Sequence, residues 1–158
     1  MAQTRIEAGV TAGGWSQPHF KSAVGFTAGI FQDMEIASND KAVQYASFGL
    51  QFFDARSTFA ETGAASGATW LKVPVTTIAE IEFPGVALLA QIGAFAGYAV
   101  KSGMDIRRFN FGVTANAGVR FSRFMVKAGV DDGFLNLSRG DGARNTTRDW
   151  TVTLGYRF

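Results

Sequence analysis

Glu80 and Glu82 are the residues whose types and spacing come nearest to catalytic chemistry. On a β-strand, residues two apart share one face and lie roughly 7 Å from each other, which overlaps the carboxylate spacing of glycosidases. A buried ion-pair network explains the same carboxylates without any reaction, and it is the interpretation that we favour. His19, the one histidine of the chain, lies near Ser16 and Ser22 and could imitate a hydrolase pair. A solvated loop histidine is the simpler prediction.

Two patterns in the segment after residue 130 carry chemistry in other proteins. Asp131, Asp132 and Asp141 offer the oxygen ligands that a cation prefers, but a solvated acidic rim is the favoured interpretation. Arg139-Gly140-Asp141 matches an integrin-binding tripeptide, and three residues in a Gly-rich segment match easily by chance. We therefore predict no catalytic residue, no cofactor, no metal site and no enzymatic activity.

Composition limits the classes of protein that the chain can belong to. The chain has 158 residues, 47% of them hydrophobic and 18% charged, which suits one domain over residues 1–158. The absence of cysteine excludes a disulfide framework and thiolate metal sites. A formal charge of +2 without a basic stripe gives no reason to expect a nucleic-acid partner. The first residues, Met1 to Arg5, form no apolar signal-peptide region, which fits a mature chain.

Apolar and polar residues alternate with period two along the chain, and this pattern predicts β-strands. The eight predicted strands cover residues 4–15, 20–36, 42–53, 70–83, 86–101, 107–121, 124–131 and 147–158. The stretch 86–100 is apolar, but it is too short for a transmembrane helix. The predicted fold class is all-β, an eight-stranded antiparallel up-and-down transmembrane β-barrel.

The predicted connections differ in length from one to the next. Tight turns are expected at 38–41, 84–85 and 122–123, short loops at 16–19 and 102–106, and longer Gly-rich connections at 57–69 and 132–146. An even number of strands places both termini at one end, which is the end with the tight turns. Pro74 lies within a predicted strand, and because proline lacks a ladder donor we expect a bulge there.

Within the core of each predicted strand, the charged residues all fall in the polar phase of the alternation. A soluble barrel would turn the apolar phase inward, whereas an outer-membrane barrel turns it toward lipid. Aromatic residues of the apolar phase gather at the strand ends, as girdles at membrane interfaces do. Those at the long-loop end are Phe20, Phe52, Tyr98, Phe109 and Trp150, and those at the tight-turn end are Phe83, Phe121, Phe124, Tyr156 and Phe158. This arrangement favours an outer face in contact with lipid.

The last predicted strand, which runs from Asp149 to Phe158, alternates throughout and ends in an aromatic residue. On this strand and on residues 70–75, WLKVPV, the chain resembles the small eight-stranded outer-membrane β-barrels, the OmpA/OmpX-like group. Within that group it is most similar to the PorT-like barrels of Bacteroidetes, in a natural or a redesigned form. The resemblance implies a bacterial outer-membrane location and an assembly signal at Tyr156 and Phe158 that the barrel-insertion machinery reads.

The function expected from these observations is that of an integral membrane barrel, surrounded by lipid or detergent and monomeric. We expect a structural, scaffolding or surface-interaction role that depends on the connections 57–69 and 132–146. The alternatives are a small-solute pore and a soluble lipocalin-like barrel that binds an apolar ligand. In the favoured interpretation, ion pairs close the interior of the barrel. The predicted network consists of Arg5, Glu7, Lys72, Glu80, Glu82, Arg120, Lys127, Asp131 and Arg157.

Overall fold

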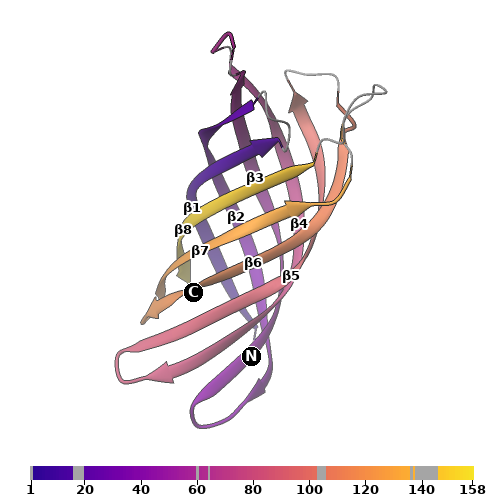
Figure 1. Ribbon diagram of the computed structural model, residues 1–158. Helices are drawn as coiled ribbons and strands as arrows, with labels where there is room; N and C mark the ends of the chain where they lie inside the picture. The colour runs from indigo at the N-terminus through magenta and orange to yellow at the C-terminus, as the bar shows by residue number, and fades with distance from the viewer. Residues whose placement is uncertain are drawn as a thin grey trace.

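The chain folds into one closed antiparallel barrel of eight strands (Figure 1). The computed structural model describes residues 2–15, 20–59, 61–63, 65–102, 106–135, 137 and 146–158. Each strand pairs with its neighbours in sequence, and β1 pairs with β8 to close the barrel. The strands are β1 (Ala2–Trp15), β2 (Phe20–Ser38), β3 (Ala42–Phe59), β4 (Ala65–Phe83), β5 (Val86–Ser102), β6 (Phe109–Phe121), β7 (Phe124–Gly133) and β8 (Thr147–Arg157).

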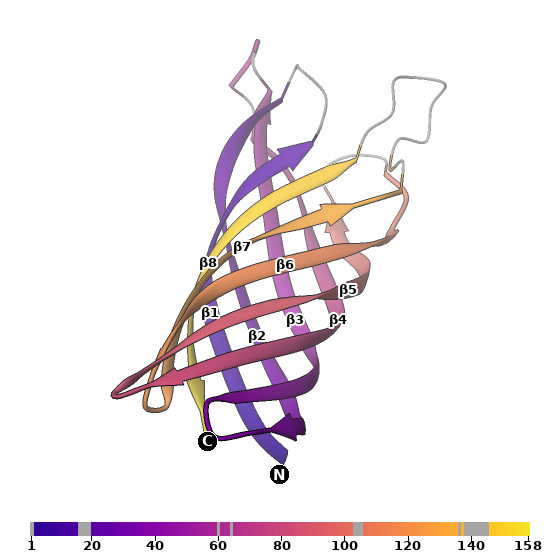
Figure 2. The ribbon, with the colours of Figure 1, turned by 60° about the horizontal axis from the view of Figure 1, so that its bottom comes forward.

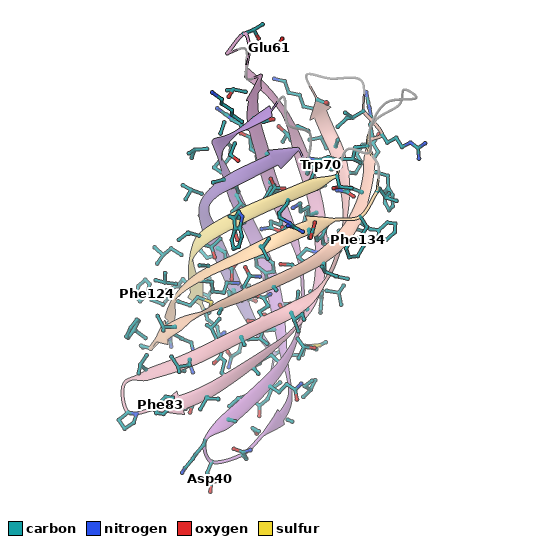
Figure 3. All side chains as sticks on the ribbon, viewed as in Figure 1. Asp40, Glu61, Trp70, Phe83, Phe124 and Phe134 are labelled. Atoms are coloured by element: carbon teal, nitrogen blue, oxygen red, sulfur yellow. The ribbon has the colours of Figure 1, made fainter. Side chains whose placement is uncertain are left out.

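The predicted fold class and the eight predicted strands are confirmed, and the apolar stretch 86–100 lies in β5. Among the described residues there is no helix that is long and apolar enough to cross a bilayer. The turns at 39–41, 84–85 and 122–123 lie at one end, together with both ends of the chain (Figure 2). We call this end the turn end. The opposite end, where Glu61 lies at the tip of the β3–β4 hairpin, is the loop end (Figure 3).

The β3–β4 hairpin corrects the prediction of a long loop over residues 57–69. β3 continues to Phe59 and β4 begins at Ala65, with Ser57 paired to Ser66. These residues are small and polar, so they carry no apolar alternation, but the backbone hydrogen bonds of a ladder do not depend on side-chain polarity. The hairpin therefore continues as paired strands at the loop end.

Pro74 lies in β4 without the predicted bulge. It pairs with Phe95 of β5, and the ladder to β3 resumes in the same register on both sides of it, at Lys72 and Val75. Because proline lacks the N–H group, the β3 ladder is interrupted locally, but no extra residue is needed. The observed register shifts lie between Ala23 and Thr27 and between Glu35 and Ala37 on β2, and between Thr69 and Trp70 on β4.

Apolar side chains cover the outer face of the barrel, while charged side chains lie inside it. Ile92 is 67% exposed and Leu154 58%, whereas Arg5 and Glu80 are fully buried. An apolar surface that continues around the whole barrel is typical of contact with lipid. The interpretation as a soluble ligand-binding barrel is wrong, because that barrel would turn these apolar residues inward.

Exposed aromatic residues lie at both ends of this apolar surface. Those toward the loop end are Phe52, Tyr98, Phe109 and Trp150, and those toward the turn end are Phe83, Phe121, Phe124 and Phe158. We call the outer surface between these two sets the apolar band. The two sets match the aromatic girdles of barrels that cross a bilayer.

Candidate functional site

The interior of the barrel is the site where the predicted residues come together. Near the turn end, Arg5 of β1 binds Asp33 of β2 through two nitrogens, Nε at 2.9 Å and Nη2 at 3.1 Å. The hydroxyl of Ser47 donates to Asp33 at 2.6 Å and accepts from Arg5 at 3.1 Å. Arg5 also forms an ion pair with Glu7 and lies 4.4 Å from the centre of the Phe31 ring. The guanidinium is thus held from three strands at once.

Glu80 joins two further arginines in the same part of the lumen. Its carboxylate accepts from Arg157 Nη2 at 2.7 Å and from Arg120 Nε at 2.9 Å. Arg120 donates through Nη2 to Glu82 at 2.9 Å, and Arg157 also forms an ion pair with Asp33 at 3.2 Å. Both carboxylates that suggested acid–base chemistry are therefore bound to arginine.

A second group of contacts lies in the middle of the lumen. Lys127 of β7 forms an ion pair with Glu7 at 2.5 Å and donates to Gln91 Oε1 at 2.8 Å. Gln91 in turn donates to Thr76 at 2.8 Å. Each of these four side chains is buried. Because a buried ammonium group needs both charge compensation and hydrogen-bond acceptors, this arrangement satisfies Lys127 from β1 and β5.

A third group lies toward the loop end, where Lys72 of β4 reaches across the barrel to Asp131 of β7 at 2.8 Å. The ammonium group of Lys72 also lies 3.4 Å from the centre of the Phe53 ring and 4.5 Å from that of Phe95. Asp149 pairs with Asp131 across the β7–β8 ladder and is itself buried. Lys72 is thus held by one carboxylate and by the faces of two aromatic rings, whose π-systems attract a cation.

Apolar side chains close the lumen above this ion pair. Trp70 and Phe53 come from the strands, and Ile106 and Leu137 come from the connections at the loop end. The amide of Arg107 donates to the carbonyl of Leu137 at 2.9 Å, which joins these two connections. We call this cluster the apolar plug; it contains Phe53, Ala55, Ala68, Trp70, Ala99, Ile106 and Leu137.

A small polar cavity lies between the central contacts and the Lys72–Asp131 pair. It measures about 30 Å³ and is lined by Glu7, Gln51, Gln91, Lys127, Asp131 and neighbouring threonines. A water molecule requires about 10–15 Å³ on this measure, so the cavity has room for roughly two water molecules. A larger solute does not fit there without movement of these side chains.

The other residues that suggested chemistry are not gathered into a site by the described structure. Ser22 is exposed on β2. The carboxylate of Asp132 forms an ion pair with Arg148 at 2.6 Å and does not gather with a second acidic group to hold a cation. Residues 16–19, which include His19, lie outside the described residues, as do residues 138–145, which include the tripeptide at 139–141.

The predicted network does not include several polar side chains that lie in the same lumen. Asp33 and Asp149 belong to the polar phase, and Ser47 and Gln91 follow the same alternation. Some of the missed apolar residues carry a different signal, two large apolar neighbours in sequence, as at Phe52-Phe53 and Trp70-Leu71. Successive side chains of a strand point to opposite faces, so one of each pair must enter the lumen. The inward members of such pairs include Phe31, Phe53 and Trp70, whereas the inward Tyr45 and Phe95 have no large apolar neighbour in sequence.

Three solved structures of outer-membrane proteins are similar to this barrel. The outer membrane enzyme PagL aligns over 95% of this chain and 98% of its own, with a TM-score of 0.64 and 12% identity. Neisserial surface protein A aligns over 100% and 99%, with a TM-score of 0.52 and 12% identity. Ail of Yersinia pestis, in complex with the heparin analogue sucrose octasulfate, aligns over 99% of both chains, with a TM-score of 0.50 and 17% identity. No protein-family model and no curated protein matches the sequence.

These likenesses extend over nearly the whole of each chain. The chain has the fold of the small eight-stranded outer-membrane β-barrels. In this barrel the apolar band and the two aromatic sets occupy the positions that contact with a bilayer requires. The buried ion pairs lie on the opposite side of the same strands, in a lumen that eight strands make just wide enough for side chains to fill.

Proposed function

We propose that the protein is an integral protein of a bacterial outer membrane whose lumen is closed. The observation that carries the proposal is the placement of apolar residues outside and buried ion pairs inside. A bilayer replaces water around the apolar band. Inside the lumen, the charges of the ion pairs compensate each other, so they do not attract ions and water as unpaired charges would. The loop end, which carries the longer connections, faces the outside of the cell.

Two barriers in series support closure rather than conduction. The first is the apolar plug, in which Leu137 is fully buried and Trp70 is 2% exposed. The second consists of the contacts among Arg5, Asp33, Glu80 and Arg157 near the turn end. Between them lies the cavity of about 30 Å³. An ion would have to cross an apolar layer and then separate several charge-assisted hydrogen bonds.

A closed barrel is suited to a structural or surface-interaction role. The rigid wall would support the β3–β4 hairpin and the connection after β7 at the cell surface. The proposed surroundings are lipid, with the protein as a monomer. At the turn end, Tyr156 lies 5.0 Å from Phe124 and 4.9 Å from Phe158 between ring centres. The contact between Tyr156, near the end of β8, and the exposed ring of Phe158 supports the proposal that these two residues form the assembly signal.

The experiment that tests closure combines conductance with labelling of single cysteines, which is clean because the chain has no cysteine of its own. In planar bilayers we expect no sustained current. A membrane-impermeant, charged thiol reagent should leave Gln51→Cys unlabelled, because Gln51 lines the central cavity. The control Ser38→Cys, at the exposed end of β2, should react fully. A steady porin-like current together with labelling of Gln51→Cys would overturn closure and favour the small-solute pore.

A further inference from the structure

The two ends of the barrel differ in exposed charge. Among the described residues, the loop end carries six exposed cations, and the acids outside the lumen at that end are three, Asp54, Glu61 and Asp132. The turn end carries three exposed acids, Glu35, Asp40 and Glu82, against two exposed cations, Lys41 and Arg123. We call the six cations the cationic rim; they are Lys21, Arg56, Lys101, Arg107, Arg108 and Arg148. An excess of positive charge is therefore confined to one end.

Arg148 lies on the outer face, directly above the apolar band. It is two residues from Trp150 on β8, and the residues on either side of it, Thr147 and Asp149, are buried in the lumen. The alternation of a strand therefore puts Arg148 and Trp150 on the same outer face, about 7 Å apart along the strand. Trp150 is 61% exposed and belongs to the aromatic set at the loop end. Interfacial tryptophans lie at the level of lipid headgroups, so the guanidinium lies at that level or just beyond it.

Arg56 has the same position on the other side of the barrel. Ala55 and Ser57 are buried, so Arg56 of β3 projects from the outer face, four residues beyond Phe52 of the aromatic set. Both arginines are oriented by a carboxylate on the same face. Arg56 Nε lies 2.6 Å from Asp54, and Arg148 Nη2 lies 2.6 Å from Asp132. Each of these contacts engages one nitrogen, and the side chains remain 56% and 65% exposed.

We propose that the cationic rim binds the phosphate groups of anionic lipids in the leaflet around the loop end, with Arg56 and Arg148 as its main contacts. The inference rests on the proposed membrane location. A guanidinium offers five donors in a planar fork that suits phosphate oxygens. A lipid is favoured over a soluble polyanion because both arginines face outward from the wall, next to the apolar band, and not toward the axis of the barrel. The band holds the acyl chains while the arginines hold the headgroup.

The test uses quenching of tryptophan fluorescence by brominated lipids in reconstituted vesicles. The Trp150 signal is isolated as the difference between the parent protein and Trp150→Phe. We expect brominated phosphatidylglycerol to bind near Trp150 about five-fold more strongly than brominated phosphatidylcholine, on the order of what one such cation contributes at an anionic surface. The preference should shrink as salt is added.

Variants separate the rim from the general charge of the protein. Arg148→Gln should abolish the preference at Trp150, and Arg148→Lys should retain most of it, because the charge remains. Arg56→Gln, on a distant strand, should leave the preference at Trp150 intact. It should lower the total amount of phosphatidylglycerol that binds to the reconstituted protein. Lys41→Gln, at the exposed β2–β3 turn, is the control and should change neither. Unchanged migration of the folded barrel on unheated gels checks each variant.

Four outcomes would contradict the proposal. Equal quenching by both brominated lipids in the parent protein overturns the lipid assignment. The same conclusion follows if Arg148→Gln keeps the preference. If the parent shows no lipid preference but soluble dextran sulfate binds and Arg148→Gln abolishes that binding, the rim serves a soluble polyanion instead. Absence of quenching at Trp150 by either lipid would overturn the membrane location itself.

Discussion

Glu80 is a carboxylate that two arginines of the lumen share. It is fully buried and binds Arg157 and Arg120. Removing one partner of a buried pair costs roughly 3–5 kcal/mol, because the other charge stays buried. We expect Glu80→Ala to lower the free energy of unfolding by about this amount, measured by urea denaturation in lipid vesicles. Glu61→Ala, at the exposed hairpin tip, should stay within about 0.5 kcal/mol of the parent. Equal effects of the two substitutions would show that water already solvates the arginines.

At the residue scale, alternation predicts which charges enter the lumen but not which charges bind each other. Glu7, Lys72, Lys127 and Asp131 all lie inside, yet their pairing depends on strand register and on side-chain length. Lys72 reaches Asp131 on the far wall rather than a carboxylate on a neighbouring strand. The inward aromatic residues also contact these charges, and a count of charges leaves them out. The ammonium group of Lys72, for example, lies over the ring of Phe53 as well as beside Asp131.

At the scale of strands, the contact between β1 and β8 decides whether the barrel is closed. Ala8 and Leu154 are direct partners across this seam, and both side chains face outward. Spin labels at Ala8→Cys and Leu154→Cys should therefore couple at the short range of neighbouring strands, where Cβ atoms lie about 5 Å apart. The control pair, Ala8→Cys with Ala94→Cys, joins strands that are not neighbours and should report a clearly longer distance. Similar distances for the two pairs would mean that the seam is open in solution.

Pro74 gives a second prediction for a single strand. Replacing it with valine supplies the missing amide to the β3 ladder, and a net hydrogen bond contributes about 0.5–1.5 kcal/mol. We expect Pro74→Val to raise the midpoint of urea unfolding. The rise should be modest, because losing proline increases the entropy of the unfolded chain and so offsets part of the new hydrogen bond.

Pro84→Ala is the control. Pro84 precedes Gly85, whose φ of 83° fits a turn that favours proline, so its loss should lower the midpoint. A lower midpoint for Pro74→Val would mean that proline relieves strain there.

Strand ends were harder to predict than strand centres, for a physical reason. Centres such as residues 86–100 contact lipid on one face, so apolar residues mark every second position. Beyond the aromatic sets that constraint ends, and the β3–β4 hairpin continues on backbone pairing alone, with Ser57 opposite Ser66. Similarly, the register between β2 and β3 shifts by one residue after Ala23 and again after Glu35, and the periodicity of the side chains does not predict these shifts.

At the scale of the whole molecule, the inverted arrangement makes the surrounding lipid part of the stability of the fold. Ala94 lies in the middle of β5 on the outer face, close to Ile92, which is 67% exposed. An arginine near the bilayer midplane costs about 2–4 kcal/mol. We therefore expect Ala94→Arg to lower the free energy of unfolding in phosphatidylcholine vesicles by that amount.

Lys21→Arg is the control, because Lys21 is exposed at the loop end and already charged. Lys127 would be a poor control, since it is packed against Glu7 and Gln91. If Ala94→Arg folds into vesicles as readily and as stably as Lys21→Arg, the outer face of β5 does not contact the hydrocarbon region.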